Sequence, residues 1–388
     1  MDSIVAQIQA IAQNTDEAGR LNIIRALKQV KVELQSPRDT LLELAVPGLT
    51  SAMLRTSADL GLLRHLTESD KPLTVTQIAD LTKASPALLE RILRYLAGVD
   101  VIKETGVNEY TANSTTRILA DPKGEAMVYH GYDTIGPVMQ AMPDFFAENN
   151  YQDVTVNTNT PFQKAHNTKL TILEWLVQNP KQFGNLQKIM TALQGSEWTE
   201  GFERFDDEAR KISSKDSSTP QASEKPFFVD VGGGHGHQCI ELGKKYPNLL
   251  GYLVLQDLPE AVNDLAPIDG VKAETYDFFQ PQPIIGAKFY YLRRIMHDWS
   301  DDKAATILRN IRAAMGPDSR VLIDDAVLPA TGTSWQSAVA DLAMMSFAGK
   351  ERTKQQWEAL AESADLRVEQ IHNYVAATYT AVIVLVAQ

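Results

Sequence analysis

The feature that most constrains the fold is an apolar run that ends in a cluster of glycines. Residues 227–236 read FFVDVGGGHG, and a helical pattern, HQCIELGKKYP, follows. Glycine lets the backbone turn sharply and lets a ligand approach the amide groups closely. The spacing Gly-x-Gly-x-Gly differs from the G-x-G-x-x-G of dinucleotide-binding folds, and no Lys-Ser/Thr pair follows it, which excludes a triphosphate P-loop. Taken alone, the motif is also compatible with a tight turn that binds nothing.

Further apolar runs alternate with helical patterns after Pro226. GYLVLQDLP, KFYYLRRI, SRVLIDDAVL and AVIVLVAQ are typical of buried strands, and segments such as DDKAATILRNIRAAM lie between them. Strands that alternate with helices form a parallel sheet covered on both faces, so residues 226–388 are predicted to be a doubly wound α/β domain. In such sheets ligands bind at the carboxyl ends of the strands.

Acidic residues lie at the ends of two apparent strands of this domain. Asp257 ends LVLQD about twenty residues after the glycines, where a carboxylate can accept both ribose hydroxyls of a nucleoside. The alternative for Asp257 is a solvated turn residue. Farther along, Asp277, Phe278 and Phe279 end a third apparent strand, which places an acid and an aromatic ring where an adenine could lodge. The pattern predicts an adenosine-bearing cofactor that lacks a triphosphate.

The N-terminal part of the chain has a different rhythm. Residues 1–60 have apolar residues at helical spacing, and residues 73–119 read as two helices followed by two short strands, the order of a winged helix-turn-helix. One face of its second helix is predicted to carry Leu88, Leu89, Ile92, Leu93 and Leu96.

This helix-turn-helix lacks the charge that DNA recognition needs. Its second helix offers only Arg91 and Arg94 as basic residues, whereas phosphate contacts supply most of the affinity of DNA-binding proteins. We therefore interpret residues 1–120 as a packing or dimerisation domain. Residues 121–225 are predicted to be a helical segment that contributes to a substrate pocket, ending in a polar loop, FDDEARKISSKDSSTPQASEKP, over residues 205–226.

Composition excludes several partners and locations. The net charge of −12 argues against a nucleic acid or an anionic membrane as the main partner. No stretch approaches the ~18 apolar residues that span a bilayer, and the N-terminal residues do not resemble a secretory signal. The single cysteine, Cys239, excludes an intrachain disulfide framework and favours the cytosol. His235 and His237 have no supporting acid or thiol cluster, so no metal site is predicted.

Several motifs in combination resemble one enzyme family. VDVGGGHGHQCIEL, LQDLPEAV, YDFF, YYLRRIMHDWSDDKA, LIDDAVLP and FAGKERTKQQWEALA occur in the order and spacing of the S-adenosylmethionine-dependent O-methyltransferases of the plant caffeate and flavonoid type. The fungal secondary-metabolism branch is the most similar. The resemblance covers nearly the whole chain and implies a Rossmann-like methyltransferase domain, an N-terminal winged-helix dimerisation domain, a homodimer, and S-adenosyl-L-methionine as the cofactor.

The resemblance also implies roles for individual residues. The expected contacts with the cofactor come from the glycine loop, the acids after the strands and one arginine, namely Gly232, Gly233, Gly234, Asp257, Asp277, Phe278 and Arg293. The implied catalytic group is a general base with two acids that frame it, namely His297, Asp325 and Glu351. A pocket for a hydrophobic or aromatic substrate is expected to involve Phe183, Met190, Met344, Met345 and His130. For these five residues, helix core or a structural role is the alternative.

The chemistry of methyl transfer fits a histidine base. The acceptor hydroxyl must lose its proton as it attacks, and an imidazole of pKa near ~6.5 can take the proton of a phenol of pKa near ~10 without a metal. The alternative for His297 is a structural residue whose ring packs on Trp299. Relatives usually carry glutamate where this chain has Asp325, and the missing methylene shortens the reach by ~1.5 Å, so the imidazole could be held less well.

Three functions follow from this sequence. The first is O-methylation of a hydroxyl on an aromatic or polyketide-derived small molecule. The second is a ring closure by a methyltransferase-fold pericyclase, which binds the same cofactor without transferring its methyl group; Asp325 and Arg294 keep this alternative open. The third is a DNA-binding regulator, which lacks the basic surface that it would need.

Overall fold

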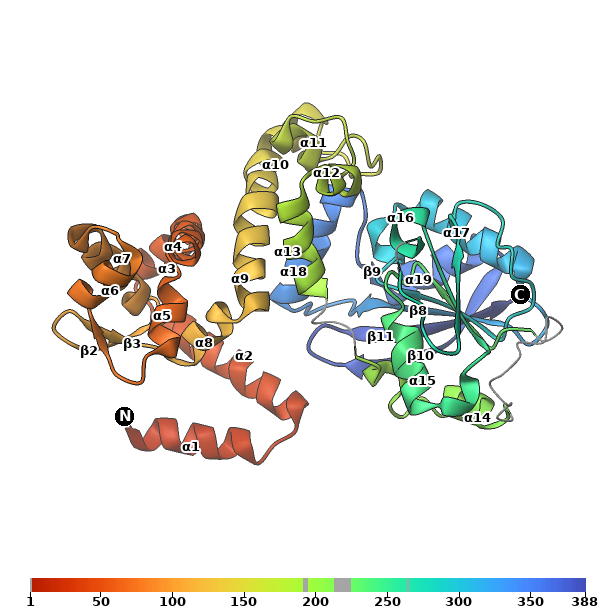
Figure 1. Ribbon diagram of the computed structural model, residues 1–388, viewed down its shortest axis with the longest axis horizontal. Helices are drawn as coiled ribbons and strands as arrows, with labels where there is room; N and C mark the ends of the chain where they lie inside the picture. The colour runs from red at the N-terminus through yellow and green to blue at the C-terminus, as the bar shows by residue number, and fades with distance from the viewer. Residues whose placement is uncertain (1, 191–194, 213–224, 264) are drawn as a thin grey trace. The chain divides into compact units, whose positions relative to one another are not determined.

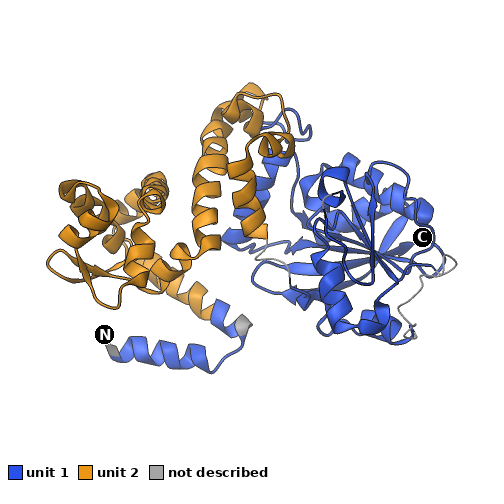
Figure 2. Cartoon of the chain, viewed as in Figure 1, with its two compact units in different colours: residues 1–21, 151–160, 194–388 blue, residues 22–150, 161–193 orange. Residues whose placement is uncertain are grey.

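The computed structural model describes residues 2–190, 195–212, 225–263 and 265–388 (Figure 1). The chain divides into two compact units (Figure 2). Unit 1 comprises Met1–Leu21, Tyr151–Thr160 and Gln194–Gln388, and unit 2 comprises Asn22–Asn150 and Pro161–Leu193. The short stretch 151–160 therefore belongs to unit 1, although the helices before and after it belong to unit 2.

Unit 1 is built on a mixed sheet with the strand order β10-β11-β8-β7-β4-β5-β6, and β9 pairs with β8. Strands β4 to β8 pair with one another in parallel, whereas β11 runs antiparallel to both β8 and β10. The predicted α/β domain is confirmed, but its antiparallel edge was not predicted. The strands are β4 (Phe228–Val231), β5 (Leu253–Asp257), β6 (Val271–Thr275), β7 (Phe289–Arg293), β8 (Arg320–Leu328), β9 (Arg352–Thr353), β10 (Leu366–Val375) and β11 (Thr380–Ala387).

Helices cover both faces of this sheet, because consecutive strand residues point to opposite sides. Tyr290 and Leu292 of β7 pack with α17 and α19 on one face, whereas Phe289 and Tyr291 pack with α14 and α15 on the other. The helices of unit 1 are α1 (Asp2–Gln13), η3 (Glu197–Thr199), α14 (Glu203–Arg210), α15 (His237–Lys245), η4 (Pro247–Leu249), α16 (Pro259–Val262), η5 (Met296–Asp298), α17 (Asp301–Ala314), α18 (Trp335–Met344), η6 (Met345–Phe347) and α19 (Lys354–Glu362).

The order of the strands fixes where a ligand site belongs. Strands β4 and β7 are neighbours in the sheet. The chain continues from β4 to β5 on one side and from β7 to β8 on the other, so the two connections run in opposite directions along the sheet. Loops at the carboxyl ends of β4 and β7 therefore diverge and leave a crevice, which is where doubly wound sheets bind ligands. The glycine loop follows β4 and the segment with His297 follows β7, so both lie at this edge.

The predicted loop over residues 205–226 is wrong at its start, where α14 extends to Arg210. Phe205 and Ala209 lie four residues apart on one helical face and are both fully buried. The Phe205 ring packs edge-on against Phe228 of β4. The two apolar residues are enough to fix a short helix on the sheet although the remaining residues are polar. Residues 213–224 of the predicted loop lie outside the described residues.

The winged helix-turn-helix prediction agrees with unit 2, where α6 (Val75–Thr82) and α7 (Pro86–Gly98) precede β2 (Lys103–Gly106) and β3 (Glu109–Thr111). β1 (Leu73–Thr74) completes a small sheet of order β1-β3-β2. Of the residues predicted to share one face of α7, Leu88 is 48% exposed. The buried members of that face are Leu89, Ile92, Leu93 and Leu96.

The rest of unit 2 is helical. A six-residue π-helical turn, His130–Ile135, follows α9 and is held by two side chains. The Arg55 Nε donates to both carboxylate oxygens of Asp133 at 2.9 and 3.1 Å. The His166 Nε2 lies 2.9 Å from the Thr134 carbonyl oxygen. The other elements are α2 (Glu17–Leu34), α3 (Pro37–Ala45), α4 (Pro47–Asp59), α5 (Leu62–Glu68), α8 (Ser114–Ala120), α9 (Pro122–Tyr129), α10 (Gly136–Glu148), α11 (Pro161–His166), α12 (Ile172–Gln178) and α13 (Pro180–Met190).

Over the residues that the structure describes, no helix is both long enough and apolar enough to cross a bilayer.

Candidate active site

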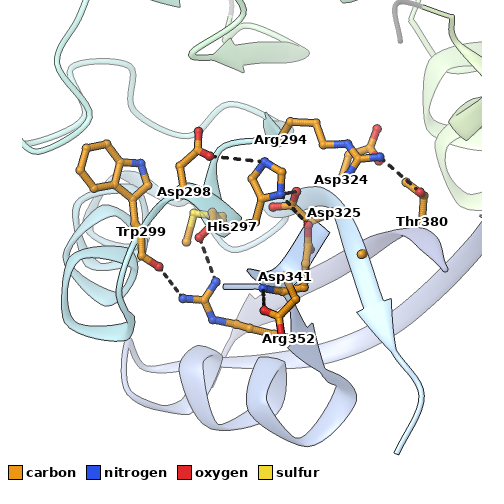
Figure 3. A network of polar contacts seen from close by, with 12 residues as sticks. Arg294, His297, Asp298, Trp299, Asp324, Asp325, Asp341, Arg352 and Thr380 are labelled. Atoms are coloured by element: carbon orange, nitrogen blue, oxygen red, sulfur yellow. Dashed lines mark hydrogen bonds and ion pairs between the residues drawn. The ribbon is translucent and has the colours of Figure 1, made fainter. Parts of the chain in front are cut away.

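The segment that carries His297 begins where β7 ends. Arg294, the residue after the strand, has a φ of +54°, a left-handed conformation that side chains rarely adopt. The chain then forms the short turn η5 before α17 starts at Asp301. His297 and Asp298 therefore lie at the carboxyl edge of the sheet (Figure 3).

Carboxylates surround the His297 ring. Its Nδ1 lies 2.9 Å from the Glu351 Oε1 and 3.8 Å from the Asp325 Oδ1, and its Nε2 lies 3.6 Å from the Asp298 Oδ1. The side chain of His297 is only 12% exposed. The structure thus brings together the three residues proposed from the sequence as a base and its two acids, and it adds Asp298, which the sequence reasoning missed. Its position directly after the histidine was the available signal.

The alternative for His297, a structural residue whose ring packs on Trp299, does not match the contacts of the Trp299 ring. Trp299 packs edge-on against Phe278 and Phe279, with ring centroids 5.9 and 4.8 Å away. The imidazole is instead oriented by its polar contact with Glu351, as a ring that exchanges protons must be.

The aspartate at position 325 falls short of a hydrogen bond. Asp325 is fully buried, and neither of its carboxylate oxygens has a hydrogen-bond partner among the described residues. The backbone of β8 does not compensate for the missing methylene, because the Asp325 Oδ1 stays 3.8 Å from the His297 Nδ1. Glu351 therefore holds the ring by contact, whereas Asp325 acts on it through charge alone.

The surrounding charges make His297 an unusually strong base. Burial by itself would lower the pKa of His297, but the carboxylates of Asp325, Asp298 and Glu351 outweigh burial and raise it to about 9. Burial raises the pKa of Asp298 to about 6 and that of Asp325 to about 7, while contact with His297 keeps the pKa of Glu351 below its usual value although burial opposes this. At neutral pH the site therefore holds an imidazolium paired with the Glu351 carboxylate.

The glycine loop and Asp257 form a second cluster at the same edge. The Gly234 N–H donates to the Asp257 Oδ2 at 2.7 Å, and the Leu258 N–H donates to the Asp257 Oδ1 at 2.7 Å. Gly232 and Gly234 have φ angles of +73° and +57°. A Cβ on Gly232 would lie 2.7 Å from the Ile295 side chain, whereas a Cβ on Gly234 would meet nothing within 4 Å. The loop is thus tightly packed at its base and open at Gly234.

Beneath this loop lies a buried acid that the sequence reasoning did not assign. Asp230 of β4 is 1% exposed, and its Oδ2 has no hydrogen-bond partner among the described residues. A Cβ on Gly233 would lie 2.4 Å from that oxygen. Burial, helped by the charge of Asp257, raises the pKa of Asp230 to about 7.

The remaining cofactor candidates lie beside these two clusters. A Cβ on Gly232 would lie 3.8 Å from the Phe278 ring, and the Asp277 Oδ1 accepts a hydrogen bond from the Phe279 N–H at 2.9 Å. Arg293 is already engaged: its Nη1 donates to the Gly195 carbonyl at 2.9 Å and lies 3.5 Å from the Asp324 carboxylate. These contacts indicate that Arg293 also anchors the segment at Gly195.

The candidate substrate contacts are divided between the units. Met344 and Met345 lie at the junction of α18 and η6 in unit 1, half-buried. Phe183 and Met190 lie on α13 in unit 2, where Met190 is 42% exposed. His130 opens the π-helical turn, and its buried Nδ1 has no partner among the described residues. Their roles in substrate binding stay predictions.

A doubly wound sheet with a glycine loop and an acid after the next strand defines a Rossmann-like nucleoside-binding domain, here joined to a winged-helix module. Family models agree with this division: an O-methyltransferase domain matches residues 221–367, and an O-methyltransferase dimerisation domain matches residues 42–121.

Known relatives match over nearly the full length. Demethylsterigmatocystin 6-O-methyltransferase of Aspergillus flavus is 40% identical over 96% of this chain and 95% of its own. A solved structure of LepI in complex with S-adenosylmethionine is 36% identical, with a TM-score of 0.87 over 100% of this chain and 98% of that one. Another, described as a pericyclic reaction enzyme, is 35% identical, with a TM-score of 0.86 over 100% of this chain and 99% of that one. The chain belongs to the O-methyltransferase family, which confirms the resemblance seen in the sequence.

The charge on His297 can be measured directly. In protein with 15N-labelled histidine, we expect the His297 ring to stay protonated at neutral pH and to titrate near pH 9, because the carboxylates favour its charged form. Asp325→Asn should move this titration to lower pH, since it removes a carboxylate 3.8 Å from the ring that raises the pKa of His297. A wild-type ring that titrates at the ordinary value of ~6.5 would contradict the geometry described above.

Proposed function

We propose that this protein is an S-adenosylmethionine-dependent O-methyltransferase that acts on a hydroxyl group of an aromatic or polyketide-derived small molecule. The observation that carries the proposal is the buried His297 ring, which Glu351 holds at the carboxyl edge of the sheet. Among the described carboxylates, only that of Asp298 borders its Nε2. A relative that matches 96% of the chain is named demethylsterigmatocystin 6-O-methyltransferase, which supports an O-methylation.

The residues at the edge of the sheet fit the cofactor. The open position at Gly234 leaves the backbone accessible, and the Asp257 carboxylate keeps lone pairs beyond its two amide contacts, as ribose hydroxyls require. The unpartnered oxygen of Asp230 lies under the loop, where it can compensate a cationic ammonium group. Asp277 and Phe278 would border the adenine. When bound, S-adenosylmethionine supplies a methyl group activated by the positive sulfur.

His297 supplies the proton acceptor. Transfer of a proton from a phenol of pKa ~10 to an ordinary histidine is uphill by ~5 kcal/mol, but transfer to an imidazole with a pKa of about 9 is uphill by only ~1.4 kcal/mol. The carboxylates therefore stabilise the imidazolium that forms as the hydroxyl loses its proton. Glu351 keeps the ring oriented, and Asp298 borders the nitrogen that faces away from Glu351.

A second candidate function is a pericyclic ring closure that leaves the cofactor intact. The observation that favours it is the similarity to a structure described as a pericyclic reaction enzyme. The raised pKa of His297 fits this reaction as well, because a protonated imidazole can donate a hydrogen bond to a developing negative charge. Both functions use the same cofactor site, so they differ in whether the methyl group leaves it.

We also propose a homodimer in the cytosol. Helices α2 and α3 carry many large apolar side chains that are at least 43% exposed, and α3 buries no residue at all. The series of exposed apolar side chains continues through residues 42–49, which belong to the segment that matches the dimerisation domain. A second copy of the chain would cover it. The free, buried thiol of Cys239 is compatible with a reducing compartment.

Methyl transfer itself is tested with methyl-labelled cofactor and demethylsterigmatocystin plus a panel of polycyclic phenols. We expect label in the product, and a loss of ~10²–10⁴-fold in rate for His297→Ala because the proton acceptor is gone. Asp302→Ala, an exposed change at the start of α17, is the control and should keep the activity. Unlabelled products together with intact cofactor would instead support ring closure and contradict methyl transfer.

Cofactor binding is tested by calorimetry. Asp257→Ala should weaken the binding of S-adenosylmethionine roughly 100-fold, since two hydrogen bonds to a charged acceptor are lost. The exposed Asp269→Ala, in the same domain, should bind like the wild type. Equal affinities of the two variants would place the ribose elsewhere.

The oligomeric state is tested by light scattering after size exclusion. We expect twice the chain mass of 42.9 kDa for the wild type, and a shift toward the monomer for a protein that carries Leu27→Asp, Val30→Asp and Leu34→Asp, because charges would enter the covered face. The control is Ile285→Asp, which is 63% exposed in unit 1. An unchanged mass in the triple variant, or binding of the wild type to anionic vesicles through this face, would contradict the proposal.

A further inference from the structure

Four consecutive residues, Gly349 to Arg352, contact the segment that carries His297, which we call the base loop (residues 296–301). The contact begins at Gly349: a Cβ there would lie 2.0 Å from the His297 carbonyl oxygen and 2.7 Å from the Asp298 carbonyl carbon. The Lys350 N–H then donates to the His297 carbonyl at 2.9 Å, and the Glu351 carboxylate meets the His297 ring. Only glycine allows this approach of the two backbones.

Arg352 completes the contact from inside the protein. Its side chain is fully buried, and its guanidinium donates to the Trp299 carbonyl at 2.8 Å (Figure 3). It also donates to the Met296 carbonyl at 2.9 Å and to the Asp301 Oδ1 at 2.9 Å. Its one charged partner among these is Asp301. A buried cation is costly unless it is paired and fully hydrogen-bonded, so these three bonds hold Arg352 and the base loop to each other.

The two carbonyl bonds lie on either side of the residues that face the reaction. Met296 directly precedes His297, and Trp299 directly follows Asp298. The planar guanidinium fork binds both carbonyls at once in a fixed geometry, which an ammonium group cannot do in the same way. A displacement of about 1 Å in such a site can cost roughly 10²-fold in rate.

We propose that Arg352 is a positioning residue for methyl transfer, which fixes the place of the His297 ring and of Asp298 by holding the backbone on both sides of them. The proposal rests on the proposed function, in which His297 accepts the proton of the substrate. None of the three hydrogen bonds of Arg352 described above reaches the ring or the three acids around it, so Arg352 positions the ring through the backbone of the base loop. Its charge also helps to lower the pKa of the adjacent Glu351.

A merely structural role for Arg352 predicts a different outcome. Loss of packing around its Trp357 contact, where the guanidinium lies 5.1 Å from the ring centroid, would lower thermal stability and reduce every activity of the protein together. A positioning role predicts that catalysis is lost while the affinity for the cofactor is kept, because the glycine loop, Asp257 and Asp277 lie at the ends of β4, β5 and β6 and not of β7.

The experiment compares Arg352→Met and Arg352→Lys with the wild type, and uses Lys354→Met, whose side chain is 64% exposed, as the matched control. Three quantities are measured: kcat and KM for methyl transfer to the phenol acceptor, the Kd of S-adenosylmethionine, and the titration of the His297 ring by NMR. For Arg352→Met we expect kcat to fall roughly 100-fold, the Kd to stay within threefold of the wild type, and the His297 titration to move to lower pH. Arg352→Lys should have a kcat between those of Arg352→Met and the wild type, and Lys354→Met should keep the wild-type kcat.

The proposal is overturned if Arg352→Met keeps kcat within threefold of the wild type, or if its Kd for the cofactor rises in parallel with the loss of kcat while the His297 titration stays in place. Should Arg352→Met fail to fold, Arg352→Lys and Gly349→Ala carry the same test, since each disturbs the base loop from a different side. The NMR titration can be recorded on a protein that does not turn over substrate, so it separates the two claims. Absence of methyl transfer by the wild type would contradict the proposed function. A His297 titration that stays in place in all three variants would contradict the positioning role.

Discussion

The contact between the His297 imidazole and the Glu351 carboxylate is the interaction on which the site depends. It joins two segments that are far apart in the sequence, the base loop after β7 and the residues before α19, at 2.9 Å. The ring is too buried for water to satisfy its nitrogens freely, so its orientation and its charge are set by the protein. Asp325 and Asp298 add negative charge around the ring without hydrogen bonds of their own to it at normal length.

This arrangement explains how one fold can serve two reactions. A histidine whose pKa is about 9 is a strong proton acceptor when neutral and a persistent hydrogen-bond donor when charged. Methyl transfer uses the first property and ring closure the second. The cofactor site that we propose at the glycine loop, Asp257 and Asp230 would be common to both reactions, and the chain is similar both to an O-methyltransferase and to a structure described as a pericyclic reaction enzyme.

Much of the fold could be predicted from the sequence because its signals are local. The buried strands of unit 1 are short apolar runs bounded by turns, and the glycine loop and Asp257 are separated by the length of one helix and one strand. Asp325 and Glu351, two of the acids around His297, were found through resemblance to a family and not through spacing. What the local pattern missed depends on tertiary contacts: α14 forms because Phe205 reaches Phe228, and β10 is a strand because β11 pairs with it.

Asp298 and Arg352 show the same limit at the site. Asp298 lies next to the base in the chain, but its charge matters because the fold places its carboxylate 3.6 Å from the His297 Nε2, where it raises the pKa of the ring. Arg352 follows Glu351 in a motif that the sequence analysis quoted, yet its role lies in three contacts with residues 51–56 positions away. A charged residue with no exposed surface is seen only in three dimensions.

The most direct test of the account is the pH dependence of single-turnover methyl transfer by the wild-type protein. A base must be neutral to accept a proton, and the folded pKa of His297 is raised to about 9. The rate constant should therefore rise about tenfold per pH unit from neutral pH and level off near pH 9. A rate that is already constant between pH 7 and 9 would contradict the claim that buried carboxylates hold His297 as an imidazolium that must lose its proton before it acts.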